Sequence, residues 1–195
     1  MLTRRDFCRT TSVVAASSMM LPNFTFGQAS ILPLYKIIAD ENFELSTAFA
    51  QHAAARGANV HVGSSDITSL WFHDLEPRWR HTPLAIAGLT TPEALFCLEQ
   101  LARDHGMRVV TRAEHRMRNH EVIEHSIYGP SEVVSCMDYG CKTTTAWPAT
   151  VADALLTFPS TPRLFTTTTI AQNVAREQRL NDTLVSWLIA LPHRA

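Results

Sequence analysis

The chain has 195 residues, of which 46% are hydrophobic and 18% are charged, and its formal net charge is −1 at pH 7. The apolar fraction is sufficient for a buried core, whereas the small net charge gives no electrostatic case for binding nucleic acid or an anionic membrane surface. Beyond residue 29 no stretch is long and apolar enough for a transmembrane helix, so we expect no membrane span there.

The first segment, Leu2–Ala29, has the pattern of an export signal. It contains the paired arginines Arg4 and Arg5, followed after one residue by the apolar Phe7. A weakly apolar run too short to span a bilayer comes next, and the small residues Gly27 and Ala29 follow. This pattern resembles the twin-arginine (Tat) signal, and the resemblance covers residues 1–29 only.

The resemblance to a Tat signal implies that the protein folds before export, because this route characteristically moves folded cargo. The Tat translocase is then the partner during export, and the periplasm or another exported location is the destination. Common reasons for this route are a cofactor inserted before export or a protein partner exported together with the cargo. We expect residues 1–29 to form the signal and residues 30–195 a single domain. Whether the signal is cleaved or kept as an anchor stays open.

Residues 35–112 alternate between short β-rich runs and helical patterns. Here we predict strands at 35–40, 58–62 and 84–87, and helices at 43–56, 67–75 and 92–106. Strands at 107–113 and 122–128 are expected to form a hairpin across a polar turn. The alternation predicts an α/β fold, a Rossmann-like three-layer sandwich with a mainly parallel sheet, to which the hairpin is added.

The pattern is weaker beyond the dipeptide at 129–130. We predict a helix at 147–158, an extended segment at 166–169, a polar helix at 170–180 and a last buried strand at 184–191. In an oxidising compartment Cys136 and Cys141 are expected to form a disulfide, with Cys97 left as a buried thiol on a helix. The alternative, a metal or redox pair, needs further ligands that a Cys-x4-Cys spacing alone does not supply.

Polar residues after the predicted parallel strands form a candidate site, because ligands of such sheets bind outside the carboxyl ends of the strands. The candidate ligand-binding residues are Ser64, Ser65, Gly88, Thr90 and Thr91, and the candidate catalytic residues are Asp40, Asp66 and His115. A glycine before a helix exposes amide groups that can hold a carboxylate or phosphate. The alternative, that the threonines simply cap the helix, stays open. The chain has neither G-x-G-x-x-G nor a Walker lysine, so a standard nucleotide site is not expected and any cofactor is unidentified.

Three evenly spaced histidines, His115, His120 and His125, are weak candidates for a metal site, because imidazole binds transition metals. Five-residue steps along strands alternate between the two faces of a sheet, so we do not expect them to bind a metal together. His115 alone is a better candidate for a general acid or base. A cluster of aromatic and arginine side chains at 71–80 predicts either a contact surface or a loop anchored in the core.

Two functional hypotheses follow. The one we favour is a non-catalytic exported α/β protein that binds a small ligand or serves as an accessory subunit of a periplasmic complex. The other is a small periplasmic oxidoreductase or hydrolase with Asp40, Asp66, Thr91 and His115 around one crevice. The enzyme hypothesis requires Asp40, Asp66, Thr90 and His115 to converge at one edge of the sheet.

Overall fold

The computed structural model describes residues 30–118, 121–143, 146–162, 164–171 and 182–192. The predicted signal, His120 and most of the helix predicted at 170–180 lie outside these residues. The strands are β1 (Leu34–Asp40), β2 (Val60–Gly63), β3 (Ala85–Thr90), β4 (Arg108–Arg118), β5 (Glu121–Pro130), β6 (Phe165–Ala171) and β7 (Asp182–Ala190). The helical elements are α1 (Glu44–Ala55), α2 (Thr68–Leu70), the π-helical turn η1 (Trp71–Leu75), α3 (Glu76–Trp79), α4 (Pro92–Asp104), α5 (Ser131–Thr143) and α6 (Trp147–Leu156).

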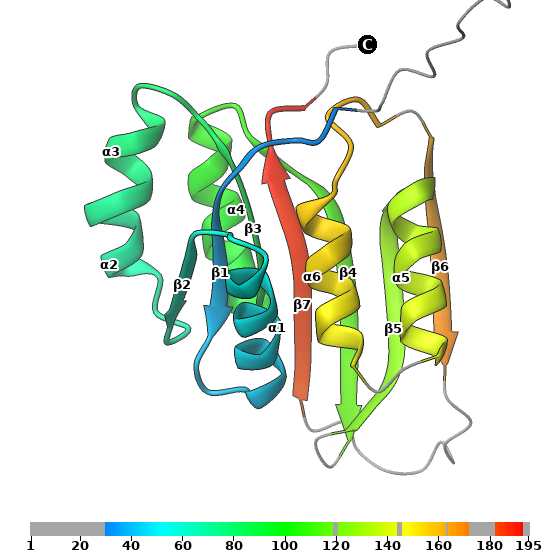
Figure 1. The fold of residues 1–195 in the computed structure, drawn as a ribbon. Coiled ribbons are helices and arrows are strands. Elements are labelled where there is room, and N and C mark those ends of the chain that lie inside the picture. Colours follow the sequence, from blue (N-terminus) through cyan, green and yellow to red (C-terminus); the bar gives the residue numbers. More distant parts are fainter. Residues whose placement is uncertain (1–29, 119–120, 144–145, 163, 172–181, 193–195) are drawn as a thin grey trace, which may run out of the picture.

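The seven described strands form one sheet in the order β2-β1-β3-β7-β4-β5-β6 (Figure 1). The pairings of β1 with β2 and with β3 are parallel, and the other four described pairings are antiparallel. The α/β class is therefore confirmed, but the sheet is mixed rather than mainly parallel. The reason is the C-terminal strand β7, which enters between β3 and β4 and runs antiparallel to both.

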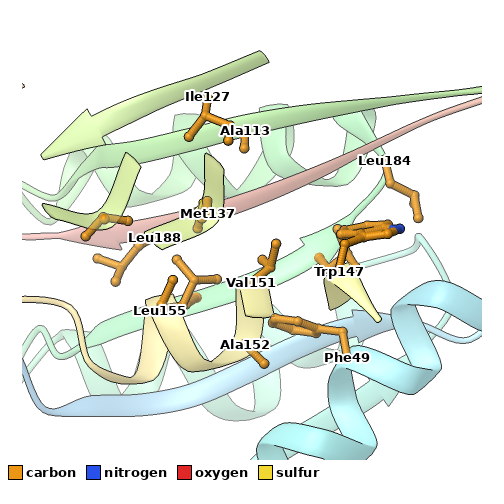
Figure 2. Packing of buried hydrophobic residues seen from close by; sticks show 14 of the residues in the cluster. Phe49, Ala113, Ile127, Met137, Trp147, Val151, Ala152, Leu155, Leu184 and Leu188 are labelled. Atoms are coloured by element: carbon orange, nitrogen blue, oxygen red, sulfur yellow. The ribbon is translucent and has the colours of Figure 1, made fainter. Parts of the chain in front are cut away.

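Two hydrophobic cores lie on opposite faces of the sheet. The first lies beneath α1, α5 and α6 (Figure 2), and the second lies beneath α2 to α4. Strand β7 contributes to both by alternation, since Leu184 and Leu188 belong to the first core while Val185 and Trp187 belong to the second. A strand buried on both faces is accordingly almost continuously apolar.

The far part of the sheet, β5 and β6, has a different environment. Helix α5 packs on one face of these two strands, whereas α4 packs on β4 and β7. On the other face of β5 and β6 the side chains of Tyr128 and Phe165 are about half exposed, at 48% and 46%. No described helix covers that face, so the three-layer arrangement is not confirmed over the whole sheet.

Helix α4 begins where its sequence predicts. The N-cap Thr91 is extended, with φ −70° and ψ 157°, and its side chain accepts a hydrogen bond of 3.4 Å from the amide of Ala94. Pro92 occupies the first turn, where its missing N–H costs nothing. Such a cap stabilises a helix by roughly 1 kcal/mol, so this boundary is set by local chemistry.

Helix α5 was not predicted, because its sequence contains a glycine and only a short apolar stripe. Gly140 faces α6, where an added Cβ would lie 2.1 Å from Thr150 Cγ2. The glycine that weakens the helical pattern therefore permits close packing of α5 on α6.

The expected disulfide is wrong. Cys136 and Cys141 are both free, and both lie on α5. Residues five apart on a helix point in different directions, and here Cys136 is exposed and Cys141 is buried. Burial and then the Asp138 charge raise the pKa of the Cys141 thiol to about 12, so it is protonated and unreactive at neutral pH. Cys97, expected to be buried, is exposed.

The aromatic cluster at 71–80 anchors the α2–α3 segment in the second core. Trp71 and Trp79 are buried and meet edge to face, with ring centroids 5.9 Å apart. Phe72 is exposed. Of the two interpretations of this cluster, core anchoring therefore accounts for both tryptophans. Among the described residues, no helix has the length and apolar character needed to cross a membrane.

Candidate functional site

Asp40 at the end of β1 is buried and fully engaged with its neighbours. One carboxylate oxygen accepts hydrogen bonds from the backbone amide and side-chain amide of Asn42, at 3.0 and 2.9 Å. The other accepts a 2.5 Å hydrogen bond from the hydroxyl of Ser65, in the loop after β2. Because β1 and β2 are parallel neighbours, the structure does bring these two predicted residues together. Their geometry holds two loops in place.

Gly88 and Thr90 lie within β3, which is longer than predicted, rather than in a loop. A Cβ on Gly88 would lie 2.5 Å from the Ile38 carbonyl oxygen and 2.7 Å from the Trp187 ring. Thr90 is buried and accepts a 3.0 Å hydrogen bond from the indole N–H of Trp187. With Thr91 capping α4, the contacts of this segment are those of packing and capping.

Asp66 and Ser64 lie on the surface after β2. Asp66 accepts a 2.9 Å hydrogen bond from the amide of Thr68, and its pKa is lowered by its hydrogen bonds with Thr68. Ser64 accepts a 3.4 Å hydrogen bond from the Asp66 amide. These contacts order the turn that leads into α2.

The four residues that the enzyme hypothesis requires do not converge. Thr90 is bonded to Trp187 and thus belongs to the face covered by α4. His115 lies on the same face of β4 as Ala113 and Met117, which are two residues before and after it and belong to the core beneath α5 and α6. The sheet therefore separates Thr90 from His115. Asp66 lies on the surface, where its carboxylate accepts a hydrogen bond from the amide of Thr68 in α2.

The structure assembles a different polar group, a buried chain of Ser186, His115 and His125. The register of the β4–β5 hairpin places the two histidines directly opposite each other. Their Nδ1 atoms are 2.7 Å apart, and Nε2 of His115 is 2.9 Å from the Ser186 hydroxyl on β7. With both rings neutral, Ser186 donating to His115 and His115 donating to His125 satisfies these contacts.

Trp147, at the start of α6, covers this pair. Its ring stacks on His115 with a centroid distance of 4.3 Å and an interplanar angle of 30°, and it meets His125 edge to face at 5.3 Å. Figure 2 shows Trp147 beside Leu184 at one end of the first core. The two histidines and Ser186 are at most 2% exposed. The Ser–His–His chain resembles a nucleophile relay only in its order of hydrogen bonds, because a substrate has no access to it here.

The environment keeps both histidines uncharged. Burial, and secondarily the neighbouring His125, holds the pKa of His115 well below its ordinary value. Burial lowers the pKa of His125 to about 4. At pH 7 the pair is thus neutral, and His115 is a structural group rather than an accessible acid or base.

The sequence does not indicate the pairing of His115 with His125, because this pairing depends on an irregularity in the hairpin register. Counting evenly outward from the turn would place His115 opposite Glu124, but the register shifts by one residue between Met117 and Arg116, and this shift pairs His115 with His125. No local sequence pattern marks Ser186, because its contact with His115 depends on where β7 enters the sheet. Among the described residues there is no group of three potential metal ligands.

A second polar cluster joins β1 to η1. Lys36 Nζ is 2.5 Å from one carboxylate oxygen of Asp74, and the Tyr35 hydroxyl donates to the other. Burial alone raises the pKa of Asp74, but the hydrogen bonds from Lys36 and Tyr35 outweigh it and leave the pKa below its ordinary value. This ion pair fastens the α2–α3 segment to the sheet.

Two hollows open at the end of the sheet where strands β1 and β4 begin, whereas the predicted crevice lies at the opposite ends of the parallel strands. One, of about 540 Å³, lies between residues 31–34, 55–58 and 156–157. The other, of about 410 Å³, we call the Arg108 hollow, and its lining includes Arg108, Val109, Tyr128, Phe158, Phe165 and Leu191. Among the described residues Arg108 is the one charged side chain that lines it.

The Arg108 hollow combines a flat aromatic wall with a positive charge. The Tyr128 and Phe165 rings stack with centroids 5.9 Å apart and an interplanar angle of 30°. The guanidinium of Arg108 donates a 2.7 Å hydrogen bond to the carbonyl of Met107. A guanidinium has five N–H groups, so others are available to an anion. Such a site can hold a molecule with an apolar body and an acidic end.

Comparisons of this chain with known protein families, with curated proteins and with solved structures find no match.

Proposed function

We propose that this protein is a non-catalytic binding protein, exported to the periplasm by a Tat-type signal, which holds a small aromatic or aliphatic carboxylate. The observation that carries the proposal is the Arg108 hollow. Its volume of about 410 Å³ lies within the range of small-molecule sites, roughly 300–1,000 Å³. Its mainly apolar lining and its one cation are the mixture that orients an amphiphilic ligand.

The chemistry of the hollow defines the ligand class. A flat or extended apolar body packs against Tyr128 and Phe165, whose rings are half exposed and lose water on binding. The carboxylate accepts hydrogen bonds from the guanidinium of Arg108, and charge-assisted bonds of this kind are roughly twice as strong as neutral ones. Because no described carboxylate lines the hollow, an anionic ligand meets no repulsion there.

The polar groups elsewhere favour binding over catalysis. Asp40 is hydrogen-bonded to residues of the neighbouring loops, and Thr90 is hydrogen-bonded to Trp187. His115 lies on the face of the sheet opposite to Thr90. A general base has to reach the proton that it abstracts, and His115 is fully buried. Within the described part of the chain, the residues that the enzyme hypothesis names therefore do not come together in one site.

Replacement of Arg108 by glutamine is expected to weaken carboxylate binding roughly tenfold or more, because a charge-assisted hydrogen bond is lost. Titration calorimetry with benzoate, phenylacetate and octanoate measures the affinities, and methyl benzoate tests the need for the charge. Arg103→Gln is the matched control, since Arg103 is exposed and pairs with Glu99 on α4. If these acids do not bind, or if R108Q and R103Q bind them equally, the hollow is not a carboxylate site.

Replacement of both Arg4 and Arg5 by lysine is expected to leave the protein in the cytoplasm. Lysine keeps the charge but not the planar guanidinium that defines the paired-arginine pattern. Cell fractionation with immunoblotting measures the distribution, and Arg9→Lys, which lies outside the pair, is the control and is expected to be exported normally. Equal export of the double variant and the control would contradict a Tat-type signal.

A second candidate function is that of an accessory subunit of a periplasmic complex. It is favoured by the exposed apolar side chains at the hollow end of the sheet, since Ile31, Leu164 and Leu191 are all more than half exposed. Mild purification from the native cell envelope, followed by mass spectrometry, tests it. Recovery with a stoichiometric partner supports this role, whereas recovery without any other protein contradicts it.

A further inference from the structure

Among the described strands, β6 lies at one edge of the sheet and has β5 as its one neighbour (Figure 1). Its seven residues, Phe165–Ala171, include four consecutive threonines and contain no charged residue and no proline. The pairing with β5 continues over all seven residues without a bulge. The outer row of backbone N–H and C=O groups on β6 is therefore regular.

Edge strands of monomeric proteins are normally protected from pairing with another chain. Short length, charged side chains, proline and bulges are the usual protective devices. The opposite edge strand, β2, is short, with four residues. Strand β6 has none of the four devices, and Thr166, Thr167 and Thr169 are exposed. Among the described residues the β6 edge is therefore free to pair with a further strand.

We propose that β6 pairs with β6 of a second copy of this chain, antiparallel about a twofold axis at Thr168, so that two seven-stranded sheets become one. In this register Thr168 lies opposite its own copy, and Thr167 lies opposite Thr169 of the second copy. Phe165 lies opposite Ala171 of the second copy, so a large side chain meets a small one.

A second copy fits this edge because β6 is complementary to itself. Threonine pairs across antiparallel strands are favourable, and no charge is brought opposite a like charge. A closed twofold contact also uses the edge of both subunits at once and leaves no β6 edge free for further pairing. The pairing adds cover to Phe165, which is 46% exposed in the single chain. This inference concerns the strand edge and does not rest on the ligand of the Arg108 hollow.

The position of the twofold axis permits a sharp test by charge exchange. Thr168→Lys and Thr168→Glu each place two like charges opposite each other, so each variant alone is expected to weaken dimerisation roughly fivefold or more. A mixture of the two variants places lysine opposite glutamate and is expected to recover dimers, all of them heterodimers. Analytical ultracentrifugation of the exported protein measures the dissociation constants, and native mass spectrometry counts the two subunit types.

Thr82→Lys is the control, because Thr82 is exposed and lies before β3, far along the sheet from β6. It is expected to dimerise like the unaltered protein. Circular dichroism and thermal unfolding of the Thr168 variants show whether each is folded, and the mixing experiment compares folded variants. A monomeric unaltered protein overturns the proposal, as does a dimer that T168K and T168E leave unchanged. Failure of the mixture to form heterodimers, with both variants folded, also overturns it.

Discussion

Acidification from pH 7 to pH 4 is expected to remove about 3 kcal/mol of folding stability through His125 alone. Its pKa is about 4 in the folded protein, below the 6.5 of an exposed histidine. Between these two values the unfolded chain binds a proton that the folded chain does not. The stability present above pH 6.5 is therefore lost as the pH falls towards 4. His115 acts in the same direction, because its pKa is also lowered.

Denaturant unfolding at pH 7, 5.5 and 4 measures this loss, and His125→Gln isolates it. Glutamine keeps a polar group opposite His115 but does not titrate, so the variant is expected to be less stable at pH 7 and less sensitive to acid. His73→Gln is the matched control, since His73 is exposed and lies outside the buried chain. If H125Q and the unaltered protein lose equal stability between pH 7 and pH 4, the buried pair is not the acid-sensitive element.

Replacement of Gly88 by alanine is expected to destabilise the fold by about 3 kcal/mol. The added Cβ would lie 2.5 Å from the carbonyl oxygen of Ile38, which belongs to the neighbouring strand β1 and has little room to move. It would also lie 2.7 Å from the Trp187 ring, which is fully buried and bonded to Thr90. Both contacts are closer than packed atoms tolerate, so strand and ring must shift together.

Denaturant unfolding of Gly88→Ala, Trp187→Phe and the double variant measures the cost and its origin. Phenylalanine removes the part of the ring that the Cβ meets, so the double variant is expected to be more stable than the sum of the single changes predicts. A Gly88→Ala protein as stable as the original would show that β3 has space at this position. Its glycine would then call for another explanation, such as the exposed amide of an anion site.

The sequence predicts the elements whose signals are local. The N-cap Thr91 and the apolar stripe after it locate α4 to within about two residues, which is the usual precision of such boundaries. The strand predicted at 84–87 is real but continues to Thr90, because β1 and β7 pair with it on both sides beyond Gly88. Gly88 was expected to lie in a loop because glycine is common in loops. In the structure it lies within β3, where its missing side chain leaves room for the Trp187 ring.

The candidate site was predictable only where neighbouring strands are parallel and consecutive. Asp40 and Ser65 meet because β1 and β2 pair side by side, as alternating strands and helices predict. His115 was expected at the same site and lies across the sheet, since its side is decided by the β4 alternation and the hairpin register. The Arg108 hollow is lined by several segments that lie far apart in the sequence, from residue 32 to residue 192. The spacing of residues along the chain does not indicate that these segments meet.

By itself the sequence determined the local structure of this protein: the capped helix, the hairpin, the alternating elements before it and the apolar last strand. Only the tertiary structure decided that β7 enters between β3 and β4, which makes the sheet mixed and delivers Ser186 to the buried histidines. The physical reason is that a strand with two apolar faces is stabilised by burying both of them, and it can bury them next to any of several strands in the interior of the sheet. Its neighbours are chosen by the packing of the whole sheet and not by its own pattern.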